Sequence, residues 1–339
     1  MGKIGKCASI GVLLCAIGFF LYSATNEPSF VIDVVYTWVD GNDPEWQKMR
    51  AQAARYFQRN HAADGNAPCR FRDRNELKYS LRSVWKFAPF VNHIYIVTCG
   101  QIPKWFKPHP KITFVHHKDI FLNKADLPTF NSHAIEAHLH RIPGLSEYFV
   151  YFNDDVFLGK EAQVSDFFSP SGQIRFCFSP YTSASGFVVR QDTGWKSGWK
   201  NTNTLLDSTF HHEQRKSFAH APLPLRKSLV QEVEKKFPHI FTTDSANKFR
   251  SFSDYTLING FIYYYAHYTH QGREGPVVAK IVRLGPNAAK TEHKLKKFAA
   301  KQYHAFCIED VPTQKEHNLH PMVAAFLERY FPEKAPWEK

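Results

Sequence analysis

The sequence predicts an α/β protein built on a doubly wound, mainly parallel, Rossmann-like sheet. Short segments rich in β-branched and aromatic residues alternate with longer segments of helical periodicity, and this alternation favours a parallel sheet with crossover helices. Acidic turns directly follow two of the expected strands. Because ligands of such sheets bind beyond the carboxyl ends of the strands, the same pattern predicts where a functional site would lie.

The expected elements follow one another along the chain. Pro44 suits the first turn of a helix, because its missing N–H would have no helical partner there, and Pro143-Gly144 ends another helix. The expected strands are residues 31–39, 94–98, 112–116, 148–152 and 303–308. The expected helices are residues 45–58, 75–87, 132–141, 225–237, 254–268 and 320–330. Residues 157–219 are rich in aromatic residues and lack a clear period, so they are interpreted as an inserted subdomain.

The composition is that of a globular protein with a basic surface. Of the 339 residues, 43% are hydrophobic and 15% are aromatic, which is enough to form a packed core. The formal net charge of +12 suits an anionic partner such as a membrane surface or a diphosphate substrate. Nucleic-acid binders concentrate their basic residues, whereas those of this chain are scattered apart from Arg70, Arg72 and Arg74. A nucleic-acid partner is therefore not expected.

The N-terminal segment predicts a membrane anchor. Lys3 and Lys6 precede an apolar stretch over residues 8–22, and flanking lysines keep the N-terminus cytosolic and place the remainder across the membrane. A cleaved signal peptide is the alternative, because small residues Ser23 and Ala24 follow the stretch. The sequence thus divides into a cytosolic tip with a signal anchor at 1–29 and one folded domain at 30–339.

The cysteines do not predict a zinc site. Cys69, Cys99, Cys177 and Cys307 lie in the folded part, widely spaced and without a C-x-x-C pair. Structural zinc sites usually draw on such closely spaced pairs.

The strongest local signal is Asn153-Asp154-Asp155, which follows the apolar strand segment YFVYF. Burying an unpaired charge costs several kcal/mol, so adjacent carboxylates at this point either lie in an exposed turn or bind a cation. A hard divalent cation prefers oxygen ligands and offsets the charge of a diphosphate. An Asx turn that ends the strand is the alternative.

Two further clusters have a functional and a structural interpretation. Asp40 and Asp43 follow the first strand, where they are either a second acidic cluster of the site or part of a turn. Arg70, Arg72 and Arg74 precede a helix, and arginine forks at a helix start suit phosphate oxygens. Surface ion pairs are the alternative for the arginines.

The C-terminal half supplies single residues rather than clusters. His220 precedes an expected helix, where it is either structural or a general base toward a hydroxyl, a role that suits histidine side chains in general. Arg250 and Asp254 flank the start of another helix and would in the simplest case cap it. Glu309-Asp310 repeats the pattern of an acidic pair after a strand.

Together these segments resemble the Stealth family, which includes the α/β subunit of the lysosomal-enzyme N-acetylglucosamine-1-phosphotransferase and bacterial capsule polymerases. The first region resembles IDVVYTWVDGNDP at residues 32–44, and the second runs from RFRDRNELKYSLRSVWKF to YFNDDV. The third includes AHAP and FRSFSD, and the fourth includes FCIED. The four regions occur in order at about 31–44, 70–156, 219–268 and 303–330, so residues 30–339 would form one Stealth catalytic domain.

The resemblance implies an activity, a cofactor and a location. The enzyme would transfer N-acetylglucosamine-1-phosphate, or a related hexose-1-phosphate, from a UDP-sugar to a hydroxyl of a glycan or glycoprotein, and release UMP. Mg²⁺ or Mn²⁺ would assist. With the anchor, the resemblance implies a type II membrane protein of the Golgi with a luminal catalytic domain. The alternatives are a metal-dependent glycosyltransferase that releases UDP and a non-catalytic glycan-binding protein.

The resemblance also assigns roles to individual residues. It implies a catalytic group of His220, Asp154 and Arg250. It implies a metal-binding group of Asp154, Asp155 and Asp310. The substrate-binding residues would be Asp40, Arg70, Arg72, Arg74 and Asp254. The chain departs from the family pattern at Glu309, where an asparagine is more usual, and it lacks the accessory modules that the lysosomal enzyme carries between the second and third regions.

Overall fold

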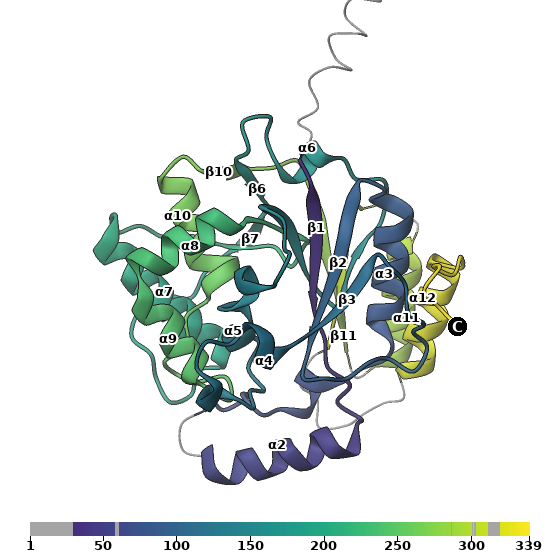
Figure 1. Ribbon diagram of the computed structural model, residues 1–339, viewed down its shortest axis with the longest axis horizontal. Coiled ribbons are helices and arrows are strands. Elements are labelled where there is room, and N and C mark those ends of the chain that lie inside the picture. The colour runs from purple at the N-terminus through teal and green to yellow at the C-terminus, as the bar shows by residue number, and fades with distance from the viewer. Residues whose placement is uncertain (1–29, 58–60, 286, 300, 302, 311–318) are drawn as a thin grey trace, which may run out of the picture.

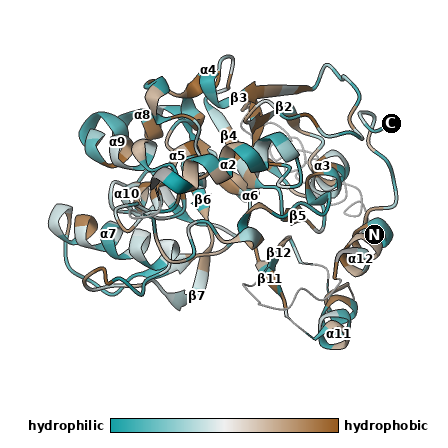
Figure 2. Ribbon diagram, turned by 90° about the horizontal axis from the view of Figure 1, so that it is seen from below, coloured by the Kyte–Doolittle hydropathy of each residue, from teal (hydrophilic) through white to brown (hydrophobic). Residues whose placement is uncertain are grey.

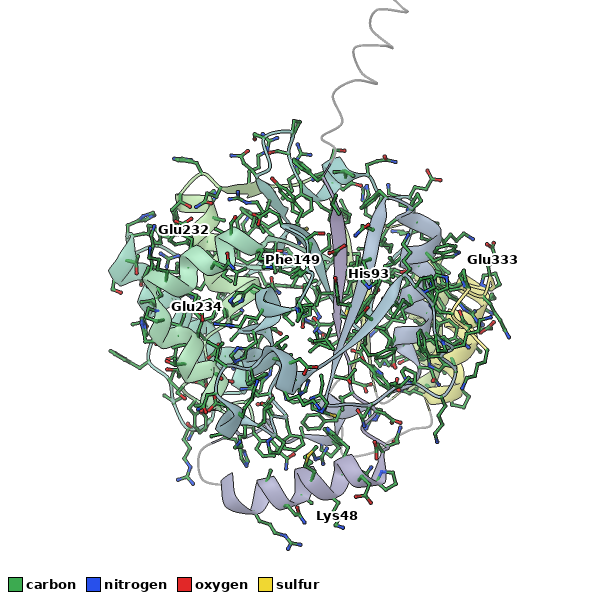
Figure 3. All side chains as sticks on the ribbon, in the orientation of Figure 1. Lys48, His93, Phe149, Glu232, Glu234 and Glu333 are labelled. Atoms are coloured by element: carbon green, nitrogen blue, oxygen red, sulfur yellow. The ribbon has the colours of Figure 1, made fainter. Side chains whose placement is uncertain are left out.

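The computed structural model describes residues 30–57, 61–285, 287–299, 301, 303–310 and 319–339. The strands lie at the centre of the molecule, and helices pack on both sides of them (Figure 1). Phe149, labelled in Figure 3, is fully buried at this centre, whereas Glu333 lies at the periphery with an exposed side chain. The expected α/β architecture is therefore confirmed.

The main sheet has five strands in the order β3-β2-β1-β4-β9. Its bounds are β1 Ile32–Thr37, β2 Val91–Thr98, β3 Ile112–His116, β4 Tyr148–Asn153 and β9 Leu223–Arg226. The first four strands are parallel and β9 runs antiparallel to β4. All six residues of β1 are buried, as expected for a parallel strand that is covered on both faces. The sheet is thus mainly parallel, as predicted, with one antiparallel edge.

A second sheet adjoins the first through a two-residue link. It has the order β11-β12-β5, with β11 at Ala279–Leu284, β12 at Ala305–Asp310 and β5 at Val156–Leu158. Because only two residues separate the end of β4 from the start of β5, the chain passes directly from one sheet into the other at this point. The ring of Phe157 stacks on that of Phe306 at 4.9 Å and anchors β5 in an aromatic core.

The helices divide between the two sides of the sheets. On one side lie α3 Glu76–Phe87, α11 Ala288–Ala299 and α12 His320–Tyr330, and on the other α5 Ser132–Glu136, α7 Gly194–Thr209, α8 Lys227–Lys236, α9 Pro238–Ala246 and α10 Tyr263–Tyr268 (Figure 1). Helix α2, Pro44–Phe57, follows β1 and lies across the carboxyl end of the main sheet. Figure 2 shows many hydrophilic residues along α2, as expected for a helix on the outside of the molecule.

The structure corrects several expected elements. Residues 157–219 are not irregular, because they contain β5, α6 Val164–Phe167, β6 Ile174–Phe176, β7 Phe178–Thr182, α7 and β8 Lys216–Phe218. The helix expected over 225–237 begins later, because residues 223–226 form the strand β9 and α8 begins at Lys227. The strand expected over 303–308 extends to Asp310. The helix expected over 254–268 is a π-helix, Leu257–Ile262, followed by α10. The helix expected over 132–141 is α5 followed by a 3₁₀ turn, Leu139–Arg141.

The expected membrane anchor at residues 8–22 lies outside the described residues. Within the part of the chain that the structure describes, none of the helices combines the length and the apolar character that crossing a bilayer requires.

Candidate active site

Asp154 and Asp155 form the two-residue link between the sheets. The β4 strand ends at Asn153 and β5 begins at Val156, so the acid pair occupies the turn between them. The backbone N–H of Ile308 in β12 donates to the carbonyl oxygen of Asp155 at 3.1 Å. Both acidic side chains are half-buried. The backbone of the pair is therefore held by two sheets at once, at the carboxyl end of β4 where the fold predicts a ligand.

The acid pair concentrates negative charge that the protein offsets only in part. Burial raises the pKa of Asp154 well above the usual range of a carboxyl group, and the charges of Asp155, Glu76 and Asp73 raise it further. Burial also raises the pKa of Asp155, whereas His220 acts in the opposite direction. A bound cation would stabilise both ionised carboxylates.

His220 lies in a bend shortly before β9, the strand that pairs with β4. This position brings its imidazole to the turn at the end of β4, where it lies beside Asp155 and Cys307. The Nδ1 atom of His220 lies 3.3 Å from Sγ of Cys307. The thiol of Cys307 in turn donates to Oδ2 of Asp155 at 3.3 Å. The predicted proximity of the histidine and the acids thus agrees with the structure, with a thiol between them.

Cys307 is the member of this site that sequence reasoning missed. It lies in the middle of β12, opposite Val156 in β5, and is fully buried. Burial and the charge of Asp155 raise the pKa of its thiol well above the usual range. In sequence it is one apolar-looking residue of a strand, and only the pairing of β12 with β5 places it between the two polar side chains.

Asp310 lies in a different environment from the acid pair. Arg72 Nη1 donates to Oδ2 of Asp310 at 2.9 Å, and Arg74 Nη2 donates to Oδ1 at 2.7 Å. Among the described residues, the three potential metal ligands that come within 4.8 Å of one another are Asp155, His220 and Cys307. This group differs from the predicted metal-binding group, which contained Asp154 and Asp310 instead of the histidine and the thiol.

Arg70 and Arg250 form a second pair of cationic groups. Arg70 makes an ion pair with Asp64, and its Nε donates to the carbonyl oxygen of Asp64 at 2.8 Å. Arg250 Nη2 donates to Oγ of Ser132 at 2.7 Å. Burial lowers the pKa of Arg250 to about 10, and the charge of Arg70 contributes to this shift. The charges of Glu136, Asp254 and Asp64 act on the pKa of Arg250 in the opposite direction.

The hydroxyl of Tyr151 links the end of β4 to Glu136, whose charge acts on Arg250. It lies 2.9 Å from Oγ1 of Thr37, and Asn153 Nδ2 donates to it at 3.1 Å. It also donates to Oε1 of Glu136 over a longer distance of 3.4 Å. Burial raises the pKa of Glu136 to about 7, and the charge of Arg250 opposes this shift. A continuous polar region therefore runs from the acid pair to Arg250.

Asp254 does not have the exposure that its predicted substrate-binding role requires. Its side chain is fully buried. Four donors point at its carboxylate: Asn131 Nδ2 at 3.0 Å, His133 Nδ1 at 3.1 Å, Asn247 Nδ2 at 2.7 Å and the N–H of Ser251 at 3.0 Å. We call this group the Asp254 hub. It ties the segment before α5 to the segment around Arg250, so Asp254 holds these two segments together.

Asp40 and Asp43 form the turn that leads into α2. Oδ1 of Asp40 accepts the N–H of Asn42 at 2.9 Å, and Oδ1 of Asp43 accepts the N–H of Glu45 at 2.9 Å. Gln101 Nε2 donates to Oδ2 of Asp43 at 2.9 Å and holds the turn against the end of β2. The interpretation of the acidic residue as part of a turn fits Asp43. Asp40 remains near the acidic region, because its charge contributes to raising the pKa of Asp73 to about 6, mainly an effect of burial.

Three family models match the chain in the order expected from the sequence. They describe Stealth protein conserved regions 1, 2 and 3, and they match residues 30–57, 70–176 and 219–267. The first three expected regions are therefore confirmed.

Among curated proteins, the chain is similar to the exopolysaccharide phosphotransferases CpsY of Mycobacterium tuberculosis and SCO2592 of Streptomyces coelicolor. It is 40% identical to the first over 320 residues, which cover 93% of this chain and 59% of that protein. It is 38% identical to the second over 317 residues, which cover 93% of this chain and 34% of that protein. The chain thus spans between about a third and three fifths of the length of these relatives.

Among solved structures, the chain is similar to galactosyltransferase LgtC in complex with donor and acceptor sugar analogs. The TM-score is 0.40 at 9% sequence identity, with 91% of this chain and 98% of that chain covered.

The relatives correct one expectation from the sequence. Both named relatives are bacterial proteins, and bacteria have no Golgi. The expected location, a type II membrane protein of the Golgi with a luminal catalytic domain, is therefore wrong.

Proposed function

Because the chain belongs to the Stealth family, we propose that it is a phosphotransferase that moves a sugar-1-phosphate from a nucleotide sugar to a hydroxyl of a polysaccharide. The proposed donor is UDP-N-acetylglucosamine or a UDP-linked hexose related to it. The single observation that carries the proposal is the acid pair Asp154-Asp155 with His220 beside it at the carboxyl end of β4. The names of the relatives support an exopolysaccharide as the acceptor.

The proposed reaction is an in-line displacement at the sugar-linked phosphorus of the donor. An oxygen of the acceptor hydroxyl forms the new P–O bond, and the P–O bond to the bridging oxygen of the diphosphate breaks. UMP leaves with the electron pair of that bond, and a phosphodiester between the two sugars remains. Such a reaction needs a proton acceptor for the hydroxyl and positive charge around the phosphoryl oxygens.

His220 is the proposed proton acceptor. Its Nδ1 atom faces Cys307, so Nε2 is the ring nitrogen that is left to take the proton of the acceptor hydroxyl. The imidazole pKa lies near neutral pH in water, which is the range in which a general base works best. The half-buried position of His220 beside the acid pair leaves it reachable by a substrate.

Arg250 and Arg70 are the proposed ligands of the donor phosphates. Their neighbouring guanidinium groups repel each other, and phosphate oxygens between them would remove this repulsion through charge-assisted hydrogen bonds. Arg72 and Arg74 support the same region through Asp310. This assignment keeps the arginine cluster in substrate binding, as the sequence predicts.

A divalent cation, Mg²⁺ or Mn²⁺, is the proposed cofactor. The carboxylates of Asp154 and Asp155 suit such a hard cation, because both are acidic oxygen ligands whose ionised forms lack full compensation. When bound, the cation would offset the charge of the diphosphate and of the departing UMP. Asp310 suits it less well, since both of its oxygens accept hydrogen bonds from arginines.

The test is to identify the nucleotide that is released. We expect the full chain, incubated with UDP-N-acetylglucosamine, Mg²⁺ and a polysaccharide acceptor, to produce UMP together with a phosphodiester signal in ³¹P NMR. Release of UDP would instead indicate a glycosyltransferase, and binding of the glycan without turnover would indicate a glycan-binding protein.

Asp154→Asn should lower kcat by about 10²–10³-fold, the usual cost of losing one electrostatic stabiliser. Asp166→Asn in α6 is the matched control and should retain turnover.

A further inference from the structure

We propose that Asp155, His220 and Cys307 bind a thiophilic divalent cation of the Zn²⁺ and Co²⁺ class, and that this cation switches the enzyme off. The binding site rests on the geometry of these three side chains. Only the inhibitory consequence rests on the proposed function, in which His220 is the general base. This site shares Asp155 with the proposed Mg²⁺ or Mn²⁺ site and differs from it in the other ligands, which are His220 and Cys307.

The separations of the three ligand atoms fit one metal ion. Sγ of Cys307 lies 3.3 Å from Nδ1 of His220 and 3.3 Å from Oδ2 of Asp155. In a tetrahedral zinc site with Zn–N of about 2.0 Å and Zn–S of about 2.3 Å, two ligand atoms lie roughly 3.5 Å apart. Only small side-chain movements are therefore needed to enclose an ion.

The types of ligand atom select the class of metal. One thiolate, one imidazole nitrogen and one carboxylate oxygen form a set of mixed softness, which favours Zn²⁺ and neighbouring transition metals. Mg²⁺ binds oxygen ligands and has little affinity for sulfur. Three protein ligands also leave a fourth position open.

The site is built in advance by the fold. Its three ligands come from the turn between β4 and β5, the segment before β9, and the middle of β12. The pairing of Cys307 with Val156 fixes the thiol beside the turn, and the hydrogen bond from Ile308 to Asp155 fixes the turn itself. The ligands are far apart in sequence and include one cysteine only, which explains why cysteine spacing does not predict the site.

Binding of the metal changes the protonation of Cys307 and of His220. The ion replaces the proton on Sγ of Cys307, and one proton is released to solvent, so binding should tighten as the pH rises. A metal on Nδ1 of His220 leaves the proton of the neutral ring on Nε2. This nitrogen then cannot accept the proton of an acceptor hydroxyl, and turnover stops until the metal dissociates.

Cobalt absorption tests the site without any need for enzyme activity. We expect Co²⁺ added to the metal-free full chain to produce a thiolate-to-cobalt charge-transfer band in the near ultraviolet that saturates at one ion per chain. Cys307→Ala should abolish the band, and Cys99→Ala, a thiol outside the group, should retain it. His220→Gln should weaken Co²⁺ binding by roughly tenfold or more, by analogy with the effect of disturbing a ligand's support. Circular dichroism of each variant checks that it folds.

A second measurement tests the inhibition. In the UMP-release assay, Zn²⁺ added to the enzyme with excess Mg²⁺ should abolish turnover, and a chelator that prefers zinc should restore it. The proposed site is overturned if the wild-type chain gives no cobalt band or if Cys307→Ala gives the same band. The inhibitory role is overturned if zinc saturates the site and turnover continues. A chain that shows the band without any sugar-phosphate transfer would contradict the proposed function and leave the metal site standing.

Discussion

Two acidic groups, the Asp254 hub and the acid pair Asp154-Asp155, differ in how completely hydrogen-bond donors of the protein surround their carboxylates. The Asp254 hub surrounds one fully buried carboxylate with four hydrogen-bond donors at 2.7–3.1 Å. The acid pair Asp154-Asp155 is half-buried, its members lie next to each other, and a weak donor, the thiol of Cys307, contacts Asp155 at 3.3 Å. Both groups carry residues that the sequence marks as functional.

The difference separates a structural acid from a chemical one. A fully buried carboxylate that already accepts four hydrogen bonds is engaged by the protein itself, so Asp254 serves the arrangement of the chain around it. The charge of Asp155 raises the pKa of Asp154. A cation bound between the two carboxylates would stabilise their ionised forms. We therefore expect substitutions at the hub to affect stability and substitutions around the acid pair to affect turnover.

The largest expected effect is on turnover at the acid pair. His220→Ala should lower kcat by roughly 10²–10⁴-fold, the usual contribution of a general base, and leave the melting temperature near that of the wild type because the side chain is half-exposed. His212→Ala is the control, since that side chain is 89% exposed. Steady-state kinetics of UMP release measures the effect. Undiminished turnover of His220→Ala would remove this residue from the mechanism.

The next effect is on stability at the hub. Asp254→Ala leaves the side chains of Asn131 and His133 without their buried acceptor, and each unpaired buried donor costs about 1–3 kcal/mol. The free energy of unfolding should fall by roughly 3 kcal/mol or more, as urea denaturation would measure. Glu292→Ala, which removes an exposed ion pair with Lys296, should leave the free energy of unfolding close to that of the wild type. If Asp254→Ala kept its stability and lost turnover, the distinction between the two groups would fail.

A pH-dependent effect is expected at Glu136, which lies between the two groups. Burial raises its pKa from 4.5 to about 7, so the folded chain binds more protons than the unfolded chain between these values. This carboxyl therefore lowers stability as the pH rises through that window. Glu136→Gln removes the effect. Relative to the wild type, the variant should be about 1–3 kcal/mol more stable at pH 8 than at pH 5 in urea denaturation. An equal difference at both values would show that Glu136 titrates normally.

The smallest effect is expected where an acid only ends a turn. Asp43 accepts the N–H of Glu45 at 2.9 Å and that of Trp46 at 3.3 Å at the start of α2. Asp43→Ala should lower the free energy of unfolding by about 1 kcal/mol, the usual cost of losing a helix cap, with turnover close to that of the wild type. Thermal unfolding and UMP release would measure both. A loss of turnover near that of Asp154→Asn would place Asp43 in the site instead.

The sequence predicts the parallel core well because local signals determine it. The segments that become β1, β3 and β4 are continuous apolar runs bounded by turns, and their predicted bounds lie within a few residues of the observed ones. The antiparallel edge is harder to predict. Pro224 and the short length of β9 hide the strand, and only its pairing with β4 makes it one. Helix α7 in the aromatic segment is missed because buried polar residues such as Asn203 interrupt its apolar face.

The site is predictable in part for the same reason. Asp154 and Asp155 are visible in sequence because two acids follow an apolar strand, whereas the roles of His220 and Arg250 come from the resemblance to a family. The sequence does not predict Cys307 as a site residue, because its place in the site depends on which strand lies next to β12. Asp254 appears functional in sequence, and only the four donors around it identify its structural role. Contacts between distant segments decide these cases, and local patterns do not record them.

The pairing of β9 with β4 has a consequence for how the chain can change in length. Tyr151 pairs with Leu223, and His220 lies in a bend three residues before that point. The register fixes β9 on β4, so adding or removing one residue between His220 and Leu223 would move the imidazole relative to the turn that ends β4. We therefore expect the length of this short connection to be constrained by the distance that the imidazole must span.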